Sequence, residues 1–384
     1  MGVRPRAGVT AGPAALDTVP DVDERATPAL DAVDRLLLDT SAAARSGRTA
    51  HDVVVVGDPG AALAIAAARA AGASDGARLR AHQDSLVHER ELTTAGAEVH
   101  ALPLAPALVS GARVVLLRLP RSLDALGDVA DLVAAHADPS VVLVAAGRIK
   151  HMALAMNDVL RARFDRLDVT HARQKSRALV ARGPRAIADA GALPRVRRER
   201  HDLPGIGPVV VCAVGGVFAG TEVDIGTRFL LEHLAETPPP DGDVIDLACG
   251  SGVVATWLAL RHPTLRVAAS DVSAAAVMST AATAAANGVA DRVEVRQDDA
   301  LASRAAGSAS LIVLNPPFHD GAAIDETIAR RLFADAARVL RPGGRLWTVW
   351  NSHLRHRPTL EATVGPTRQI ARNAKFTVAV STRR

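Results

Sequence analysis

A short segment in the second half of the chain has the residue types needed to hold a planar amine. Asn315-Pro316-Pro317-Phe318 follows the apolar run 311–314. Because proline has no N–H, the loop offers acceptors with few competing donors, and the Asn315 side-chain oxygen and the Pro316 carbonyl can both accept from one NH2 group. Two such acceptors would localise the lone pair of the amine, and Phe318 offers a face on which a flipped base can stack. Asn315, Pro316 and Phe318 are therefore predicted to be catalytic residues for alkylation of an exocyclic base amine.

A second group of residues, upstream of this loop, could bind a cofactor that carries a ribose. In the segment 246–252, Gly250 and Gly252 let the backbone approach a ligand, and the start of the next helix supplies free N–H donors. Asp271 comes 19 residues after Gly252, where an acid would accept hydrogen bonds from ribose hydroxyls. Asp299, in the pair Asp298-Asp299, could face an adenine amino group. A helix cap at Asp271 and a solvated turn at Asp299 are the alternatives.

These residues fall at the ends of predicted strands. We expect strands at 243–248, 266–270, 292–297, 310–314 and 345–349, and a closing hairpin at 368–372 and 376–382. Helices are expected at 252–261, 274–287 and 327–340. Strands that alternate with helices predict an α/β fold with a doubly wound, mostly parallel sheet, whose ligands bind beyond the carboxyl ends of the strands.

The order of these motifs resembles that of class I methyltransferases acting on planar amines and amides. The loop 315–321 looks like that of the two-domain ribosomal RNA guanine-N2 methyltransferases, and 217–220 and 223–231 resemble the region before the first motif of that family. The resemblance covers about residues 209–384. It implies methyl transfer from S-adenosylmethionine to the N2 amine of a guanine in ribosomal RNA, as naked RNA or as a ribosomal subunit. The cofactor-binding residues that it implies are Asp246, Gly250, Gly252, Asp271 and Asp299.

The first half of the chain shows a weaker form of the same pattern. A strand is expected at 52–56, a helix at 61–71, and further strands at 112–117 and 140–145. The DxxxGxG order is missing, and Leu117-Arg118-Leu119-Pro120-Arg121 stands where an active domain would have Asn-Pro-Pro-Phe. We therefore expect two tandem Rossmann-like class I methyltransferase folds. The N-terminal one, at 26–200, would be degenerate and serve RNA binding or structure, so that only the catalytic domain at 209–384 would bind the cofactor. Residues 1–25 are expected to be disordered, and 195–208 to form a linker.

Basic residues gather before this linker. Residues 145–205 contain 14 lysines and arginines against six acids. This excess predicts a phosphate-binding surface, with Arg173, Lys175 and Arg177 as RNA contacts, and a solvated helical face is the alternative. The segments 147–152 and 172–177 resemble the large-subunit members of the family more than the small-subunit ones, which favours large-subunit ribosomal RNA.

Composition excludes several other classes of protein. No apolar run is long enough to span a membrane, and no export signal is visible at the start. Two cysteines without a CxxC motif, Cys212 and Cys249, argue against disulfides and structural zinc, and the 13 histidines show no metal-binding spacing. We expect a cytoplasmic monomer without a metal. The alternatives are an adenine-N6 or protein glutamine methyltransferase and a non-catalytic RNA-binding protein with a methyltransferase fold. A dinucleotide-dependent oxidoreductase is disfavoured because its third glycine would fall at Ala255.

Overall fold

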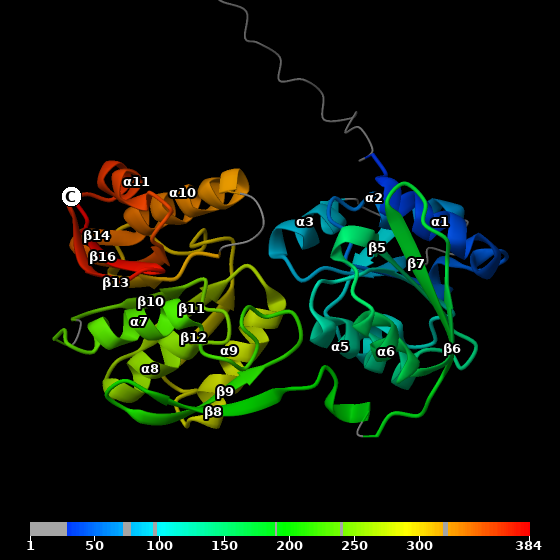
Figure 1. Ribbon diagram of the computed structural model, residues 1–384, viewed down its shortest axis with the longest axis horizontal. Helices are drawn as coiled ribbons and strands as arrows, with labels where there is room; N and C mark the ends of the chain where they lie inside the picture. Colours follow the sequence, from blue (N-terminus) through cyan, green and yellow to red (C-terminus); the bar gives the residue numbers. More distant parts are fainter. Residues whose placement is uncertain (1–28, 72–77, 95–97, 189, 239–240, 318–321) are drawn as a thin grey trace, which may run out of the picture.

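The chain folds into two α/β domains that lie side by side and are joined by a β-hairpin (Figure 1). The computed structural model describes residues 29–384 except 72–77, 95–97, 189, 239–240 and 318–321. The expected disorder of residues 1–25 and the expected stacking residue Phe318 both lie outside the described residues. Within the described part of the chain, no helix is long and apolar enough to cross a membrane.

The N-terminal domain is built on a seven-stranded sheet in the order β3-β2-β1-β4-β5-β7-β6. Its strand β7 runs antiparallel to both of its neighbours, and the other pairs are parallel. The strands are β1 (Val53–Val56), β2 (Leu79–His82), β3 (Val99–Ala101), β4 (Val114–Arg118), β5 (Val142–Arg148), β6 (Phe164–Val169) and β7 (Ser176–Pro184). The helices are α1 (Ala32–Arg45), α2 (Ala62–Ala70), α3 (Leu86–Thr94), α4 (Pro106–Val109), α5 (Leu123–His136) and α6 (Ala155–Arg161).

The C-terminal domain repeats this plan. Its sheet has the order β12-β11-β10-β13-β14-β16-β15, with β16 antiparallel to both of its neighbours. The strands are β10 (Val244–Leu247), β11 (Val267–Asp271), β12 (Val293–Gln297), β13 (Ala309–Leu314), β14 (Leu340–Asn351), β15 (Thr367–Arg372) and β16 (Phe376–Thr382). The helices are α7 (Ile225–Leu234), α8 (Val253–Arg261), α9 (Ala274–Ala286), α10 (Ala322–Val339) and α11 (His356–Thr363). The predicted pair of tandem Rossmann-like folds is confirmed.

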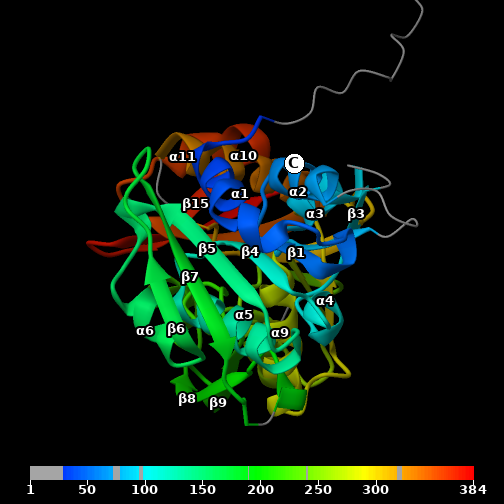
Figure 2. The same cartoon turned by 90° about the vertical axis from the view of Figure 1, so that its right-hand side faces the viewer.

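Helices cover both faces of each sheet, and this explains why the inner strands are continuous apolar runs. In β1, Val53 and Val55 pack toward α1 and α2, whereas Val54 and Val56 pack toward α5 and α6. Figure 2 shows α1 on one side of β5 and β7, with α5 and α6 on the other. The C-terminal domain follows the same rule, with α7, α8 and α9 on one face and α10 and α11 on the other.

The connection between the domains differs from the prediction. The expected linker 195–208 does lie between the domains, but most of it is regular structure: it forms β8 (Arg197–Leu203), which pairs antiparallel with β9 (Gly207–Ala213). Leu203, Val209 and Val211 are buried in the core of the C-terminal domain, and β9 packs on α9. The segment around Pro204 and Gly205 that suggested a linker is the turn of this hairpin. The domains are therefore joined by ordered structure.

Candidate active site

The carboxyl ends of β10, β11 and β13 open into a cavity of about 510 Å³, a size typical of small-molecule sites. The predicted site residues that line it are Asp246, Gly250, Asp271, Asp299, Asn315 and Pro316. Residues 70 positions apart in the sequence thus meet at one edge of the sheet, as expected for a doubly wound fold. The structure brings the two predicted groups together.

The two glycines of the first motif have different roles. Gly250 has a φ of 55°, its N–H donates to Asp271 Oδ2 at 3.0 Å, and a Cβ on it would meet no atom within 4 Å. Gly252 does not line the cavity, and a Cβ there would lie 2.7 Å from the Thr280 methyl group of α9. Gly250 therefore leaves its backbone open toward a ligand, whereas Gly252 is required for the close packing of α8 on α9.

Two buried acids hold the walls of the cavity. Asp246 accepts a hydrogen bond from the Ala255 N–H at 2.9 Å, and burial raises its pKa to about 8. Asp271 accepts from Gly250 and, at 3.0 Å, from the Ser273 N–H, and burial also raises its pKa. Asp271 therefore organises the loop after β11 and faces the cavity, but the N-cap of α9 is Ser273, so the helix-cap alternative for Asp271 is wrong.

Both acids of the pair after β12 line the cavity, but they have different partners. Asp298 accepts from the Asp299 N–H and from both the N–H and the hydroxyl of Ser303, so it shapes the turn. Asp299 lines the cavity and forms an ion pair with Arg331 of α10. Arg331 lines the same cavity, so the ion pair lies at the expected position for a cofactor base.

The Asn315 side chain is held in one orientation by two residues that the sequence analysis missed. Its Nδ2 donates to Asp224 Oδ2 at 3.1 Å and to Thr227 Oγ1 at 3.0 Å. Asp224 is also the N-cap of α7, where it accepts from the Thr227 N–H. Because a carboxylate only accepts, the NH2 group must face Asp224, which leaves Asn315 Oδ1 to serve the cavity. The spacing of Asp224 and Thr227 is that of a helix cap and could have shown where α7 begins, but not that it meets Asn315.

The N-terminal domain contains an equivalent arrangement with different chemistry. The matched registers of β1–β4 and β10–β13 place Arg118 where the catalytic half has Asn315. Arg118 forms ion pairs with Asp31, the N-cap of α1, and with Asp34, three residues later, just as Asn315 is held by the first turn of α7. A guanidinium has no acceptor, so Arg118 cannot receive a hydrogen bond from an amine.

The rest of the equivalent site also differs. The same registers place Pro59, which lacks an N–H, at the position of Gly250. The β1–β2 and β10–β11 registers place Gln83 at the position of Asp271. The hydrogen bond that joins Gly250 to Asp271 in the catalytic half therefore has no counterpart in the first half.

The basic stretch before the hairpin is largely neutralised by neighbouring acids. Eight of its 14 basic residues form ion pairs with described acids, and one of these is the predicted RNA contact Arg173, which pairs with Asp39 at 2.6 Å. Arg177 is half-buried in β7. The predicted contact Lys175 is exposed, and its carbonyl accepts from the Ile149 N–H, which places it beside the loop after β5. This loop carries the exposed side chain of Lys150.

Comparisons with known proteins match both halves. A family model described as the RLMG N-terminal domain matches residues 6–185, and the methyltransferase small domain matches residues 208–380. The ribosomal RNA large subunit methyltransferase G of Pseudomonas aeruginosa is 32% identical over 375 residues, covering 95% of this chain and 96% of that protein. The protein of the same name from Streptomyces coelicolor is 36% identical over 266 residues, covering 69% of this chain and 70% of that protein.

A solved structure shares the whole two-domain fold. The T. thermophilus 16S rRNA N2 methyltransferase, in complex with AdoMet and guanosine, superposes with a TM-score of 0.74 and 24% identity, covering 92% of each chain. The likeness confirms the class I methyltransferase fold in both domains. With the sequence matches that extend over nearly the whole chain, it leads to one assignment. The chain belongs to the ribosomal RNA large subunit methyltransferase G family.

Proposed function

We propose that this chain transfers the methyl group of S-adenosylmethionine to the exocyclic N2 amine of a guanine in large-subunit ribosomal RNA. The names of its relatives and the ligands of the solved neighbour support this substrate and this cofactor. The observation that carries the proposal is the orientation of Asn315, whose amide nitrogen is held by Asp224 and Thr227 while its oxygen is left for the cavity. We also propose that the protein acts on its RNA in the cytoplasm as a monomer.

The cavity fits S-adenosylmethionine, which has two cationic centres and two ribose hydroxyls. Its wall carries the carboxyl groups of Asp246 and Asp271, and the backbone at Gly250 is open because no atom lies where a Cβ would project. Asp271 would hold the ribose hydroxyls, and Asp246 and Gly250 the amino-acid end, while Asp299 would lie near the adenine. When bound, the cofactor supplies a methyl group on a sulfonium, which is a strong electrophile.

The residues of the chain bind and orient the amine. Asn315 Oδ1 and the Pro316 carbonyl accept from the two amine hydrogens, so that the nitrogen lone pair points into the cavity. The buried position of Pro316 and the absence of an N–H on it keep this loop rich in acceptors. Phe318 stays a predicted stacking residue, and Phe218, which is 47% exposed and lines the same cavity, offers a second ring at its mouth.

The N-terminal domain, in this proposal, binds RNA and does not catalyse. Arg118 and Pro59 replace the acceptor and the N–H donor that the catalytic half supplies, which supports the reading of a degenerate domain. For RNA, the lysines beside the loop after β5 and the start of β7, which form no ion pair among the described residues, are better placed than the neutralised arginines. Lys150 and Lys175 are exposed there, and they take over from Arg173 as the strongest candidates.

The decisive experiment is nucleoside mass spectrometry after incubation of the protein with labelled cofactor and unmodified ribosomal RNA or subunits. The proposal predicts N2-methylguanosine in large-subunit RNA, and no label without the protein. Detection of N6-methyladenosine would show that the target base is adenine. Methylated protein without methylated RNA would show that the substrate is a protein. Absence of any product, with RNA still bound, would identify a non-catalytic RNA-binding protein.

A further inference from the structure

The two domains meet through the same loop of each fold, in a nearly symmetric way. The registers of β1–β2 and β10–β11 make the segment 84–86 equivalent to 272–274, and these two segments pair with each other. The contacts are the Leu86 N–H to the Val272 carbonyl at 2.9 Å, the Ala274 N–H to the Asp84 carbonyl at 2.9 Å, and a β-bridge between Ser85 and Ser273. Reciprocal contacts between equivalent residues are the signature of a two-fold interface, here built within one chain.

Asp84 of the N-terminal domain caps a helix of the catalytic domain. Its side chain accepts from the Ala275 N–H at 2.8 Å, while its carbonyl accepts from Ala274 and from Gln297 Nε2 at 3.1 Å. The N–H groups of Ala274 and Ala275 are the first ones of α9, and such groups lack partners within their own helix. The helix begins directly after the Asp271 loop, so Asp84 fixes the loop proposed to hold the ribose.

The helix that follows Asp84 reaches the cavity itself. Asp84, Ser85, Val87 and His88 line the same cavity as Asn315. In Figure 1, α3 is the element of the N-terminal domain that lies nearest to the catalytic domain at the upper side. Since this segment bonds to the residues just after Asp271, it lies beside the loop proposed to hold the ribose.

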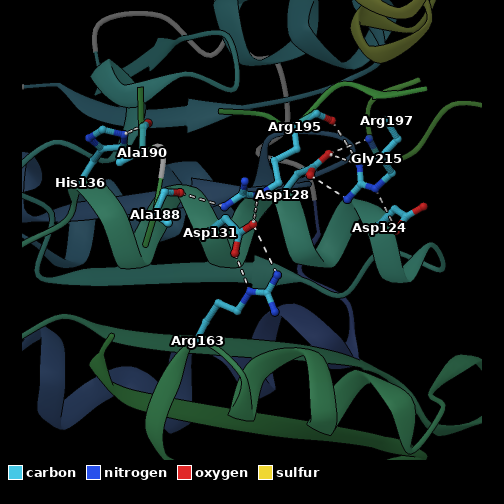
Figure 3. A network of polar contacts seen from close by, with 10 residues as sticks. All are labelled: Asp124, Asp128, Asp131, His136, Arg163, Ala188, Ala190, Arg195, Arg197 and Gly215. Carbon is cyan, nitrogen blue, oxygen red and sulfur yellow. Dashed lines mark hydrogen bonds and ion pairs between the residues drawn. The ribbon is translucent and has the colours of Figure 1, made fainter. Parts of the chain in front are cut away.

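A second contact also holds the two domains together, and it involves α5. One face of α5 carries Asp124, Asp128 and Asp131, and Figure 3 shows their carboxyl groups turned toward arginines of the connecting segment. Asp128 is 1% exposed and accepts from Arg197 Nη2 at 3.0 Å and from the Gly215 N–H of the catalytic half at 2.6 Å. A side chain at Gly215 would collide with the backbone of α5, so the two halves are in direct contact there.

We infer that the cofactor site is shared between the domains, with the N-terminal segment 84–88 as one of its walls. Asp84 is a positioning residue, which acts through the start of α9 and the Asp271 loop, and Val87 and His88 border the ligand space. The N-terminal domain thus contributes residues to the site that binds the adenosine end of S-adenosylmethionine. This inference rests on the proposed function for the identity of the cofactor, and it replaces the expectation that the C-terminal domain alone binds it.

Calorimetric titration of S-adenosylmethionine into the full chain, without RNA, tests the shared site. Val87→Trp should fill part of the cavity and raise the Kd by about 10-fold or more. Arg90→Trp is the matched control, because Arg90 is exposed on the same helix and does not line the cavity, and its Kd should stay within about 2-fold of wild type. Cofactor affinity in Val87→Trp equal to that of Arg90→Trp would overturn the shared site.

A second pair of variants tests the cap. Asp84→Ala should raise the Kd by about 5-fold, whereas Asp84→Asn, which keeps an acceptor oxygen, should bind within about 2-fold of wild type. An unchanged Kd in Asp84→Ala would refute the positioning role. If the wild-type chain itself binds no S-adenosylmethionine, the proposed function is refuted. If the wild-type chain binds it and the variants bind it equally well, only the shared site is refuted.

Discussion

Replacing Asn315 by alanine is the sharpest test of the proposed chemistry. The substitution removes the Oδ1 acceptor from the cavity and also the two hydrogen bonds that its Nδ2 donates to Asp224 and Thr227. The groups proposed to bind the cofactor, by contrast, belong to the loops after β10, β11 and β12 and to the segment 84–88, and none of them contacts the Asn315 side chain among the described hydrogen bonds. Catalysis and cofactor binding should therefore respond differently.

The expected magnitude follows from these contacts. Loss of one oriented group that acts on the reacting atoms costs about 100-fold or more in rate, which corresponds to roughly 2.7 kcal/mol of activation free energy. The two hydrogen bonds to the first turn of α7 contribute about 1 kcal/mol each to the free energy of unfolding. A domain stabilised by about 5–15 kcal/mol survives that loss, so the variant should be folded and inactive.

The assay measures methyl transfer to unmodified ribosomal RNA at saturating cofactor, next to the Kd for S-adenosylmethionine. Asn315→Ala should lose at least about 100-fold in kcat and keep its Kd within about 2-fold. Thr227→Val is a milder variant for comparison, because it removes one of the two acceptors that orient the amide and leaves Asn315 in place. Its kcat should fall by about 10-fold. If Asn315→Ala keeps more than about a tenth of wild-type activity, the acceptor role is wrong.

Three further predictions concern the domain contact, the RNA and a buried acid. Asp128→Ala should lower the free energy of unfolding by about 3 kcal/mol in urea titrations, whereas Asp124→Ala, which removes an exposed carboxylate that shares Arg197 with Asp128, should lower it by less than about 1 kcal/mol. Exchanging Lys150 and Lys175 for alanine should reduce the log–log salt slope of RNA binding by about 1 to 2 and leave cofactor affinity alone, and an unchanged slope would exclude them as phosphate contacts. Burial raises the pKa of Asp246 to about 8, so the folded chain holds a proton that the unfolded chain loses near its ordinary pKa of 3.8, and stability falls as pH rises between these values. Asp246→Asn should therefore gain in melting temperature relative to wild type between about pH 5 and about pH 8, and a constant difference would contradict the raised pKa.

The parts of the fold that follow from local patterns could be predicted from the sequence. The runs at β1, β4, β10 and β13 are apolar on both faces because helices cover both sides of the sheets, and glycines or prolines mark their ends. The strand β2 was missed because its buried face includes Arg80 and His82. The two terminal nitrogens of the Arg80 guanidinium donate to the carbonyls of His51, Ala107 and Ser110, so the partners that compensate for most of its burial lie far away in the sequence.

The site was only partly predictable for the same reason. The glycines, acids and the loop at Asn315 are contiguous motifs, and their meeting follows from the order of the strands. The hydrogen bonds from Asn315 to α7, and the wall formed by the segment 84–88, join residues about 90 to 230 positions apart, which no spacing rule shows. The β8–β9 hairpin was missed because the outer strand is rich in exposed charges and alternates weakly.

The two halves show how little backbone change separates a catalytic position from a structural one. Asn315 and Arg118 follow equivalent strands, and each is held by the first turn of the helix that precedes its sheet. The frame is the same, but an amide held by its nitrogen exposes an oxygen, whereas a guanidinium held by two carboxylates exposes no acceptor. An ion pair at Arg118 also ties α1 to the sheet, so the position that is proposed to bind an amine in one half stabilises the fold in the other. The first half can then contribute the segment between β2 and α3 to the site of the second half. The reason is that this segment pairs with the equivalent loop of the C-terminal domain and so lies beside the cavity there.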